Sequence, residues 1–515
     1  MQDPGPECPA GDTPPVLIDP GPAPRWCCAP AVAKGEYNWP AYHVFAGKRM
    51  HAATDKHICQ VAFTALNAAA LREWYANVFG LVKAGGMLFF PPATSRVQGI
   101  PGAWEKCCWL VDRQDYFQLE FFQFLRPRGQ LKPVDWRPCD IGYNMVGIAV
   151  SDFDQVMRNV SAYSRVPLPR TAGKAGARRA CVTDPEGNWV EIYEQDPIAL
   201  VEGARADVIR PEVPAVVRAV RASVPSLADA REAFVEAMGL QLVEDFQLHT
   251  PADEKLWGLP RAKAQALVLR GANFLLELVE YQSPGARAWP PGYSLADQGI
   301  MNIALGYRDS GDYARSFARA TREGMRPNGK VLDAGVFQVM YVNDKHGFSV
   351  EMLHARRALW SLTGFNPAEG YVVSEVEINA PAAEVWRRLT DHAGIGDWSI
   401  FSGKVLRPGQ PDPNAIGCIR QLTAPGMRIT EEVTAWDEGS HYAYQLRSGA
   451  PFRAHQGDVY VTGVEGRTRV RWAIRFDSRI PFSNRLTSWL LGLVFRRALR
   501  TLKSRMEAYQ PSSRF

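Results

Sequence analysis

The sequence predicts an α+β protein with two domains of paired modules and a different third domain. Each module reads as strand, helix and three further strands, and its strand-helix opening recurs near residues 60, 145, 219 and 302. Each opening leads to a strand-like run that contains a glutamate. After residue 370 the pattern changes to an amphipathic helix, several alternating strands and a long final helix. These observations predict a third domain of several strands and two helices after residue 370.

Length and composition restrict the classes of protein to consider. A chain of 515 residues is too long for one hydrophobic core, since such cores rarely exceed about 250 residues. No apolar run approaches the roughly 18 residues of a membrane span, and the N-terminus lacks the basic flank and apolar core of a signal peptide. We therefore expect no membrane span and a cytoplasmic location. We find no phosphate-binding loop, dinucleotide fingerprint or basic aromatic groove, so nucleotide chemistry and nucleic-acid binding are disfavoured.

Proline and charge mark the two ends of the chain. Ten prolines in the first 40 residues predict an irregular arm over residues 1–54. Residues 371–515 hold 20 Lys and Arg against 14 Asp and Glu, which favours either an anionic partner or a solvated basic face. The expected domains are residues 55–200, 213–360 and 371–512, with a linker at 201–212.

The first and last strands of the modules carry a recognisable pattern. The first module opens with WYANVFGL, and DPEGNWVEIYE (184–194) and NDKHGFSVEML (343–353) end the second and fourth modules. In these features the sequence resembles the vicinal oxygen chelate superfamily, which includes glyoxalase I, extradiol dioxygenases and bleomycin resistance proteins. The resemblance implies that consecutive modules pair, the first with the second and the third with the fourth.

The resemblance also implies metal-ligand positions on the first and last strand of every module. They are Gln60, Glu120, Met145 and Glu191 in the first expected pair, and Ala219, Glu277, Asn302 and Glu351 in the second. Glyoxalase I would have histidine where this chain has Met145, and a thioether binds a hard cation poorly. We favour no metal cofactor. If a metal is present, we expect Gln60, Glu120 and Glu191 to hold a Mg or Mn ion.

Paired carboxylates without a cation suit proton transfer. Two facing carboxylates repel, and burial raises the pKa of one of them, as we expect for Glu277 and Glu351. Glu120 and Glu191 are the corresponding candidates in the first expected pair, where hydrogen-bonded polar anchors are the alternative interpretation. Strand parity or turn position places His57, His346 and His354 away from these sites. We interpret these three and His249 as surface or rim residues.

The C-terminal segment has its own resemblance. INAPAAEVWRRLTD (378–391) followed by GDWS (396–399) is similar to the START-like, or SRPBCC, helix-grip fold of polyketide cyclases and lipid-transfer proteins. That fold implies an apolar cavity between the sheet and the last helix. Alternation places Tyr442, Tyr444 and Trp472 toward the cavity, together with Glu431 as a candidate catalytic carboxylate. Helical spacing adds Leu486, Trp489 and Leu493 from the last helix.

Together these features predict a non-redox cyclase, isomerase or lyase that acts on a hydrophobic, polyketide-like or aromatic oxygenated metabolite. Its candidate catalytic residues are Glu120, Glu191, Glu277, Glu351 and Glu431, and its candidate substrate-binding residues are Gln60, Met145, Asn302, Tyr442, Tyr444, Trp472 and Trp489. One alternative is a non-catalytic protein that binds or transfers a hydrophobic compound. The other is a metal-dependent glyoxalase or dioxygenase. A homodimer is left open.

Overall fold

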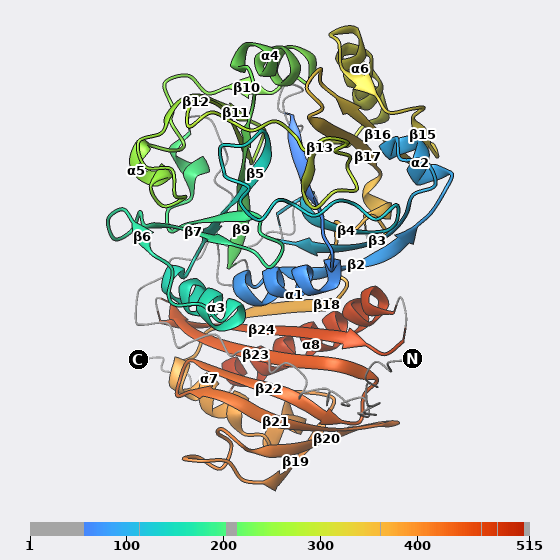
Figure 1. The fold of residues 1–515 in the computed structure, drawn as a ribbon. Helices are drawn as coiled ribbons and strands as arrows, with labels where there is room; N and C mark the ends of the chain where they lie inside the picture. The colour runs from blue at the N-terminus through green and yellow to red at the C-terminus, as the bar shows by residue number, and fades with distance from the viewer. Residues whose placement is uncertain are drawn as a thin grey trace, which may run out of the picture.

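The structure is a computed structural model that describes residues 56–112, 114–201, 214–360, 362–464, 466–480 and 483–508. The expected arm, residues 1–54, lies outside the described residues, as does the expected linker apart from Val201. The described chain forms two mixed sheets and a third, antiparallel sheet that carries the long C-terminal helix (Figure 1). The α+β class and the helix-grip arrangement are thus confirmed.

The first sheet joins the first and fourth modules. The first module supplies β1 (His57–Thr64), α1 (Ala68–Phe79), β2 (Val82–Phe89), α2 (Ala93–Gln98), β3 (Trp104–Val111) and β4 (Gln118–Arg126). The fourth supplies β13 (Gly299–Tyr307), α6 (Ser310–Arg322), β14 (Arg326–Pro327), β15 (Leu332–Asp333), β16 (Phe337–Asn343) and β17 (Ser349–Ala355). The strand order is β14-β16-β17-β13-β1-β4-β3-β2, with β15 beside β16.

The second sheet joins the second and third modules. The second module supplies β5 (Gly142–Val150), α3 (Phe153–Ser164), β6 (Thr171–Ala172), β7 (Arg179–Thr183), β8 (Trp189–Tyr193) and the 3-10 helix η1 (Pro197–Leu200). The third supplies β9 (Ala215–Ser223), α4 (Leu227–Arg231), the π-helix η2 (Glu232–Ala237), β10 (Gln241–Leu242), α5 (Pro251–Glu254), β11 (Lys263–Arg270) and β12 (Leu275–Ser283). The strand order is β10-β11-β12-β9-β5-β8-β7-β6.

Each module opens with a strand and a capped helix, as the repeat predicts. The side chains of Asn67, Asp152, Ser226 and Asp309 each accept a hydrogen bond from a backbone N–H in the first turn of their helix. Such caps satisfy donors that have no partner inside the helix. The glycine that closes the first opening, Gly80, has φ +70° and ends α1.

The expected pairing of consecutive modules is wrong. In the structure β1 runs antiparallel to β13, and β5 runs antiparallel to β9, so each sheet combines one module from each expected pair. The chain crosses from the first sheet to the second after β4 and returns after β12, through residues 127–141 and 284–298. The sequence repeat shows where a module begins, but it carries no information on which module edge becomes its partner.

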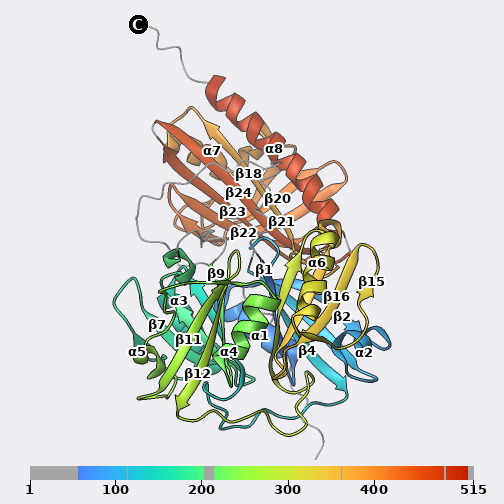
Figure 2. The ribbon, with the colours of Figure 1, turned by 90° about the horizontal axis from the view of Figure 1, so that it is seen from above.

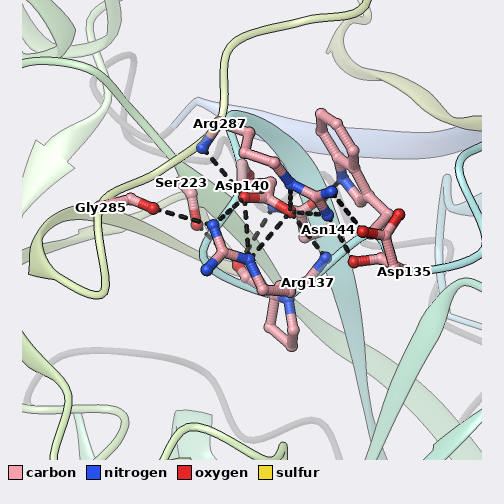
Figure 3. A network of polar contacts seen from close by, with 9 residues as sticks. Asp135, Arg137, Asp140, Asn144, Ser223, Gly285 and Arg287 are labelled. Atoms are coloured by element: carbon pink, nitrogen blue, oxygen red, sulfur yellow. Dashed lines mark hydrogen bonds and ion pairs between the residues drawn. The ribbon is translucent and has the colours of Figure 1, made fainter.

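A buried carboxylate holds the two crossing connections together. Arg137 and Arg287 both donate hydrogen bonds to Asp140 (Figure 3). The Ile141 backbone N–H donates to the Arg287 carbonyl at 2.9 Å. Burial by itself would raise the pKa of Asp140, but the hydrogen bonds from the two guanidinium groups lower it to about 2. This ion-pair network therefore fixes the crossover that brings distant modules into one sheet.

The third domain follows the mixed sheets and lies to one side of them in both views (Figures 1 and 2). After the 3-10 helix η3 (Arg357–Leu359) it contains β18 (Gly370–Ile378), α7 (Ala382–Thr390), the 3-10 helix η4 (Gly394–Asp397), β19 (Ser402–Arg407), β20 (Ile419–Ala424), β21 (Met427–Asp437), β22 (His441–Ser448), β23 (Phe452–Val464), β24 (Arg467–Ser478) and α8 (Asn484–Ala508). The strand order is β18-β24-β23-β22-β21-β20-β19. The core between α8 and this sheet includes Trp472, Phe495 and Leu499.

Candidate functional site

Two glutamates from different modules meet at one glutamine in the first sheet. Gln60 lies on β1, between β4 and β13. Its Nε2 atom lies 2.5 Å from Glu120 Oε2 on β4 and 2.7 Å from Glu351 Oε2 on β17. Gln60, Glu120 and Glu351 are each at most 5% exposed, and Asn302 on β13 is fully buried. We call Gln60, Glu120, Asn302 and Glu351 the first-sheet site.

Burial makes the carboxyl groups of this site weak acids. It raises the pKa of Glu120 to about 7, although hydrogen bonds from the Trp109 indole at 2.7 Å and the Cys107 thiol at 3.2 Å lower it. Burial and the neighbouring charge of Glu120 raise the pKa of Glu351 well above its ordinary value. Burial also raises the pKa of nearby Glu105 to about 8. In the described chain the main influences on these three pKa values include no basic side chain.

These pKa values predict that the protein loses stability as the pH rises. The folded pKa of Glu120 lies above its unfolded value of 4.5, so the folded state keeps a proton that the unfolded chain releases. The contribution of this group to the free energy of unfolding is full below about pH 4.5 and is lost as the pH rises through about 7. We expect the urea concentration at the midpoint of unfolding to decrease as the pH is raised from about 4.5 to about 7. In the Glu351→Gln variant this decrease should be smaller.

Glu323→Gln, at an exposed position after α6, is the matched control and should show the wild-type slope. A Glu351→Gln slope equal to that of the wild type would contradict the raised pKa at this site.

The connection between β17 and β18, residues 356–369, packs beside the first-sheet site. The Trp360 ring stacks on Tyr116 with centroids 4.8 Å apart, and the Phe365 ring lies 4.6 Å from the same tyrosine. A Cβ atom added at Gly364, whose φ is +82°, would lie 2.3 Å from Cγ of Trp109. The connection therefore leaves no room beside the indole that donates to Glu120.

The first-sheet site offers the type of ligand that a hard cation prefers. Gln60, Glu120, Asn302 and Glu351 supply carboxylate and amide oxygens, which suit Mg or Mn. Both polar side-chain atoms of Asn302 are buried without a hydrogen-bond partner among the described residues, so this donor set fits such an ion. This set depends on its two amide side chains, because nowhere among the described residues do three or more His, Cys, Asp and Glu side chains form a group that could hold a metal. The expected trio of Gln60, Glu120 and Glu191 is wrong, because Glu191 lies in the second sheet.

In the second sheet, basic side chains already neutralise the corresponding carboxylates. His249, from the loop between β10 and α5, contacts Glu277 through Nδ1 and Glu191 through Nε2. Arg221 Nη1 lies 3.1 Å from Glu277, and Arg179 Nη1 lies 3.6 Å from Glu191. Burial alone would raise the pKa of Glu277, but Arg221 and His249 lower it to about 2. We call Glu191, Arg221, His249 and Glu277 the second-sheet site.

The second-sheet site does not fit a metal ion. Its other two expected ligand positions, Met145 and Ala219, are buried in apolar clusters, and Ala219 has no donor atom. The imidazole of His249 lies between the two carboxylates, where it supplies the compensating positive charge. Burial alone would lower the pKa of His249, but Glu191 and Glu277 outweigh it and raise that pKa.

The interpretation of His249 as a rim residue is wrong, and so is that of His354, which is 2% exposed. Parity along a strand could not locate His249, because it lies in a loop that reaches over the sheet. His354 Nδ1 lies 2.9 Å from the Tyr307 carbonyl oxygen, and His57 Nε2 lies 2.9 Å from that of Tyr116. His346 is partly exposed, as expected, and pairs with Asp229 at 2.7 Å.

A buried ion pair lies at the centre of the third domain. Arg420 on β20 donates to Glu431 on β21 at 3.0 Å, and both residues are at most 4% exposed. The guanidinium lies 4.5 Å from the centroid of the Tyr444 ring, and the Trp472 indole donates to the Tyr444 hydroxyl at 2.8 Å. Tyr442, Tyr444 and Glu431 are buried, as their alternation predicts. Arg420 was not expected here, although it shares strand parity with the buried Leu422.

Removing the arginine alone should destabilise the third domain. Arg420→Met leaves Glu431 buried without its cation, which costs about 3–5 kcal/mol of the free energy of unfolding. The double variant Arg420→Met/Glu431→Leu removes both charges and should recover most of that loss. Urea unfolding followed by tryptophan fluorescence measures both values. If the double variant is as unstable as Arg420→Met, Arg420 does not act by compensating the buried charge of Glu431.

Trp489 does not line a cavity, contrary to expectation. Its side chain is 59% exposed on α8, and Leu486 and Leu493 are also exposed. The buried residues of α8 are instead Gly492, Phe495, Ala498, Leu499 and Leu502. The run WLLGLVF, residues 489–495, is apolar on all sides of α8, so its spacing could not show which face packs.

Two hollows lie away from both carboxylate sites. One, of about 40 Å³, is lined by residues of the two crossing connections and of the strands that follow them, which include Trp136, Tyr143 and Trp289. The other, an open hollow of about 640 Å³, lies along α8 beside Leu493 and Arg496. In the described chain, no helix is long and apolar enough to cross a membrane.

Comparisons with solved structures give the following likenesses. A glyoxalase I mutant from Zea mays is 15% identical, with a TM-score of 0.39, over 58% of this chain and 94% of its own. A candidate dioxygenase from Bacillus subtilis is 14% identical, with a TM-score of 0.42, over 61% and 91%. A START superfamily protein from Mycobacterium smegmatis is 15% identical, with a TM-score of 0.25, over 27% and 98%. Nothing about activity follows from likeness at this level.

The comparison with curated proteins gives no match. Residues 371–507 match the family described as polyketide cyclase / dehydrase and lipid transport. The chain thus combines two mixed sheets with a C-terminal segment that matches this family.

Proposed function

We propose that the protein is a non-redox enzyme, a cyclase, isomerase or lyase, that moves protons at the first-sheet site on a hydrophobic oxygenated metabolite. One observation carries the proposal. Glu120 and Glu351 are buried, both accept from the same amide nitrogen of Gln60, and their main electrostatic influences include no basic group. Such a pair holds one proton near neutral pH, as general acid-base catalysis requires.

The two carboxyl groups differ in a way that assigns their roles. Glu120 accepts hydrogen bonds from Trp109 and Cys107 that favour its ionised form, so it is the base. Glu351 has the more strongly raised pKa and keeps the proton, so it is the acid. Glu120 takes a proton from a carbon next to a carbonyl, and Glu351 gives its proton to the carbonyl oxygen, which yields an enol. Return of a proton to a different carbon isomerises the substrate, while attack of the enol carbon on a second carbonyl closes a ring.

A hard cation is compatible with the same residues. Gln60, Glu120, Asn302 and Glu351 would hold it, and it would polarise a substrate carbonyl. It would also keep both carboxylates ionised, and the shared proton would be absent. Metal analysis of the purified protein therefore tests the proposal, because a stoichiometric bound metal would overturn the proton-sharing pair. A metal-dependent glyoxalase or dioxygenase is then the function to consider.

The third domain supports a second candidate function, the binding or transfer of a hydrophobic ligand. Its family description includes lipid transport as well as cyclisation. Its buried charged groups already pair with each other, since Arg420 donates hydrogen bonds to Glu431. This arrangement favours holding a ligand over chemistry within that domain, and it assigns Glu431 a structural role.

Proton exchange tests the proposed enzyme without knowledge of its natural substrate. The purified protein is incubated in heavy water with a panel of β-diketones and β-keto esters that carry aromatic substituents, and NMR follows the loss of the acidic C–H signals. We expect exchange faster than in buffer alone for at least one compound. If no compound of the panel exchanges faster with the protein than in buffer, although the protein binds some of these compounds, the binding function is favoured.

A further inference from the structure

The first half of α8 presents an apolar stripe to solvent. Leu486, Trp489, Leu490 and Leu493 follow the spacing of one helical face and are 62%, 59%, 48% and 44% exposed. Ile480, just before the helix, is 56% exposed. Figure 2 shows α8 along the outer edge of the third domain. We call Leu486, Trp489, Leu490 and Leu493 the apolar stripe.

The stripe is not required for folding of the domain. The opposite face of the same helix packs on the sheet through Phe495, Leu499 and Leu502, which are at most 7% exposed. Contiguous exposed apolar groups on a folded domain usually mark a binding surface. The stripe is therefore available to a partner outside the described chain.

Positive charge continues the same face toward the C-terminus. Arg496, Arg497 and Arg500 line an open hollow next to Leu493, together with Thr501, Ser504 and Arg505. Within the described residues these arginines form no ion pair, whereas Lys503 lies 3.5 Å from Glu507, the sole acidic residue of α8. We call Arg496, Arg497 and Arg500 the arginine cluster.

We propose that α8 docks the protein on the surface of an anionic phospholipid bilayer. The apolar stripe, with a tryptophan within it, enters the boundary between headgroups and acyl chains, and the arginine cluster contacts phosphate groups beside it. A protein partner would need an apolar groove for the apolar stripe and acidic groups at the matching distance for the arginine cluster. An anionic bilayer offers apolar acyl chains and negative headgroups side by side over its whole surface. The helix lies on the membrane and does not span it, in agreement with its six basic side chains.

Vesicle binding of the full-length protein tests the docking. Sedimentation is measured with phosphatidylcholine vesicles and with vesicles that contain roughly 30% phosphatidylglycerol. We expect binding to the anionic vesicles that weakens when salt is raised from about 0.1 M to 1 M, because salt screens the arginines. We expect Trp489→Ser/Leu493→Ser and Arg496→Gln/Arg497→Gln/Arg500→Gln each to weaken binding by at least on the order of tenfold.

A matched control lies at the opposite edge of the same sheet. Lys404→Gln/Leu406→Ser changes one exposed basic and one exposed apolar residue on β19, and it should bind as the wild type does. Circular dichroism verifies that each variant is folded. Binding of the wild type to both kinds of vesicle equally, or unchanged binding by Trp489→Ser/Leu493→Ser, would overturn the proposal. A dimer in sedimentation velocity that Trp489→Ser/Leu493→Ser dissociates, without vesicle binding by the wild type, would assign the stripe to a second copy instead.

Discussion

The Glu351→Gln variant is expected to catalyse proton exchange on the order of 10² to 10⁴ times more slowly than the wild type. Glutamine keeps the size of the side chain and its contact with Gln60, but it has no acidic proton to give to the substrate oxygen. Glu120→Gln should cause a loss of similar size, because it removes the base. The rate is measured by NMR in heavy water on the compound that the wild-type protein exchanges fastest.

The control for this experiment is Glu323→Gln, which changes an exposed carboxylate after α6 and should leave the rate unchanged. The double variant Glu120→Gln/Glu351→Gln should be little slower than either single variant, because the two groups act as one unit. Exchange at the wild-type rate in Glu351→Gln would remove the first-sheet site from the mechanism.

The His249→Leu variant is expected to lose about 3–5 kcal/mol of the free energy of unfolding. The imidazole lies between Glu191 and Glu277, so its removal leaves two buried carboxylates facing each other with only the arginines to offset them. His346→Leu is the matched control, because His346 pairs with Asp229 at a partly exposed position where such a pair contributes about 0–1 kcal/mol. Urea unfolding of the three proteins at about pH 6 gives the comparison.

The pH dependence of the His249 effect has a defined sign. The folded pKa of His249 is raised above 6.5, so its contribution is full below about pH 6.5 and is lost as the pH rises through the folded value. The Glu277 pKa is lowered to about 2, so its contribution is present above about pH 4.5 and is lost as the pH falls toward 2. The difference between wild type and His249→Leu should therefore be largest between about pH 4.5 and 6.5. A difference that grows above that range would contradict the charged imidazole.

Sequence patterns located the glutamates of both sites but not their partners. The resemblance and alternation along each strand identified Gln60, Glu120 and Glu351 as site residues, but they assigned Glu351 to a different expected pair from Gln60 and Glu120. Their meeting in one site depends on a long-range choice of strand partner, which a repeat of about 84 residues leaves open. The structure makes that choice through the crossing connections that Asp140 and Arg287 hold together.

Loops and uniformly apolar helices limit what sequence alone can show. His249 reaches its site from a loop, where no periodicity defines the direction of a side chain. In α8 the run WLLGLVF is apolar on every side, so Trp489 could be assigned to either face. By contrast, Glu431 and Tyr444 lie on the strands β21 and β22, where alternation predicted their inward orientation.

The connection that joins the third domain to the rest of the chain, residues 356–369, also packs against a hydrogen-bond partner of Glu120. Gly364 abuts the indole of Trp109, and that indole donates the hydrogen bond that makes Glu120 the more acidic member of its pair. Any side chain at position 364 would displace this indole, since its Cβ atom would lie 2.3 Å from Cγ of Trp109. The segment that leads to the third domain therefore also helps to set the proton affinity of Glu120.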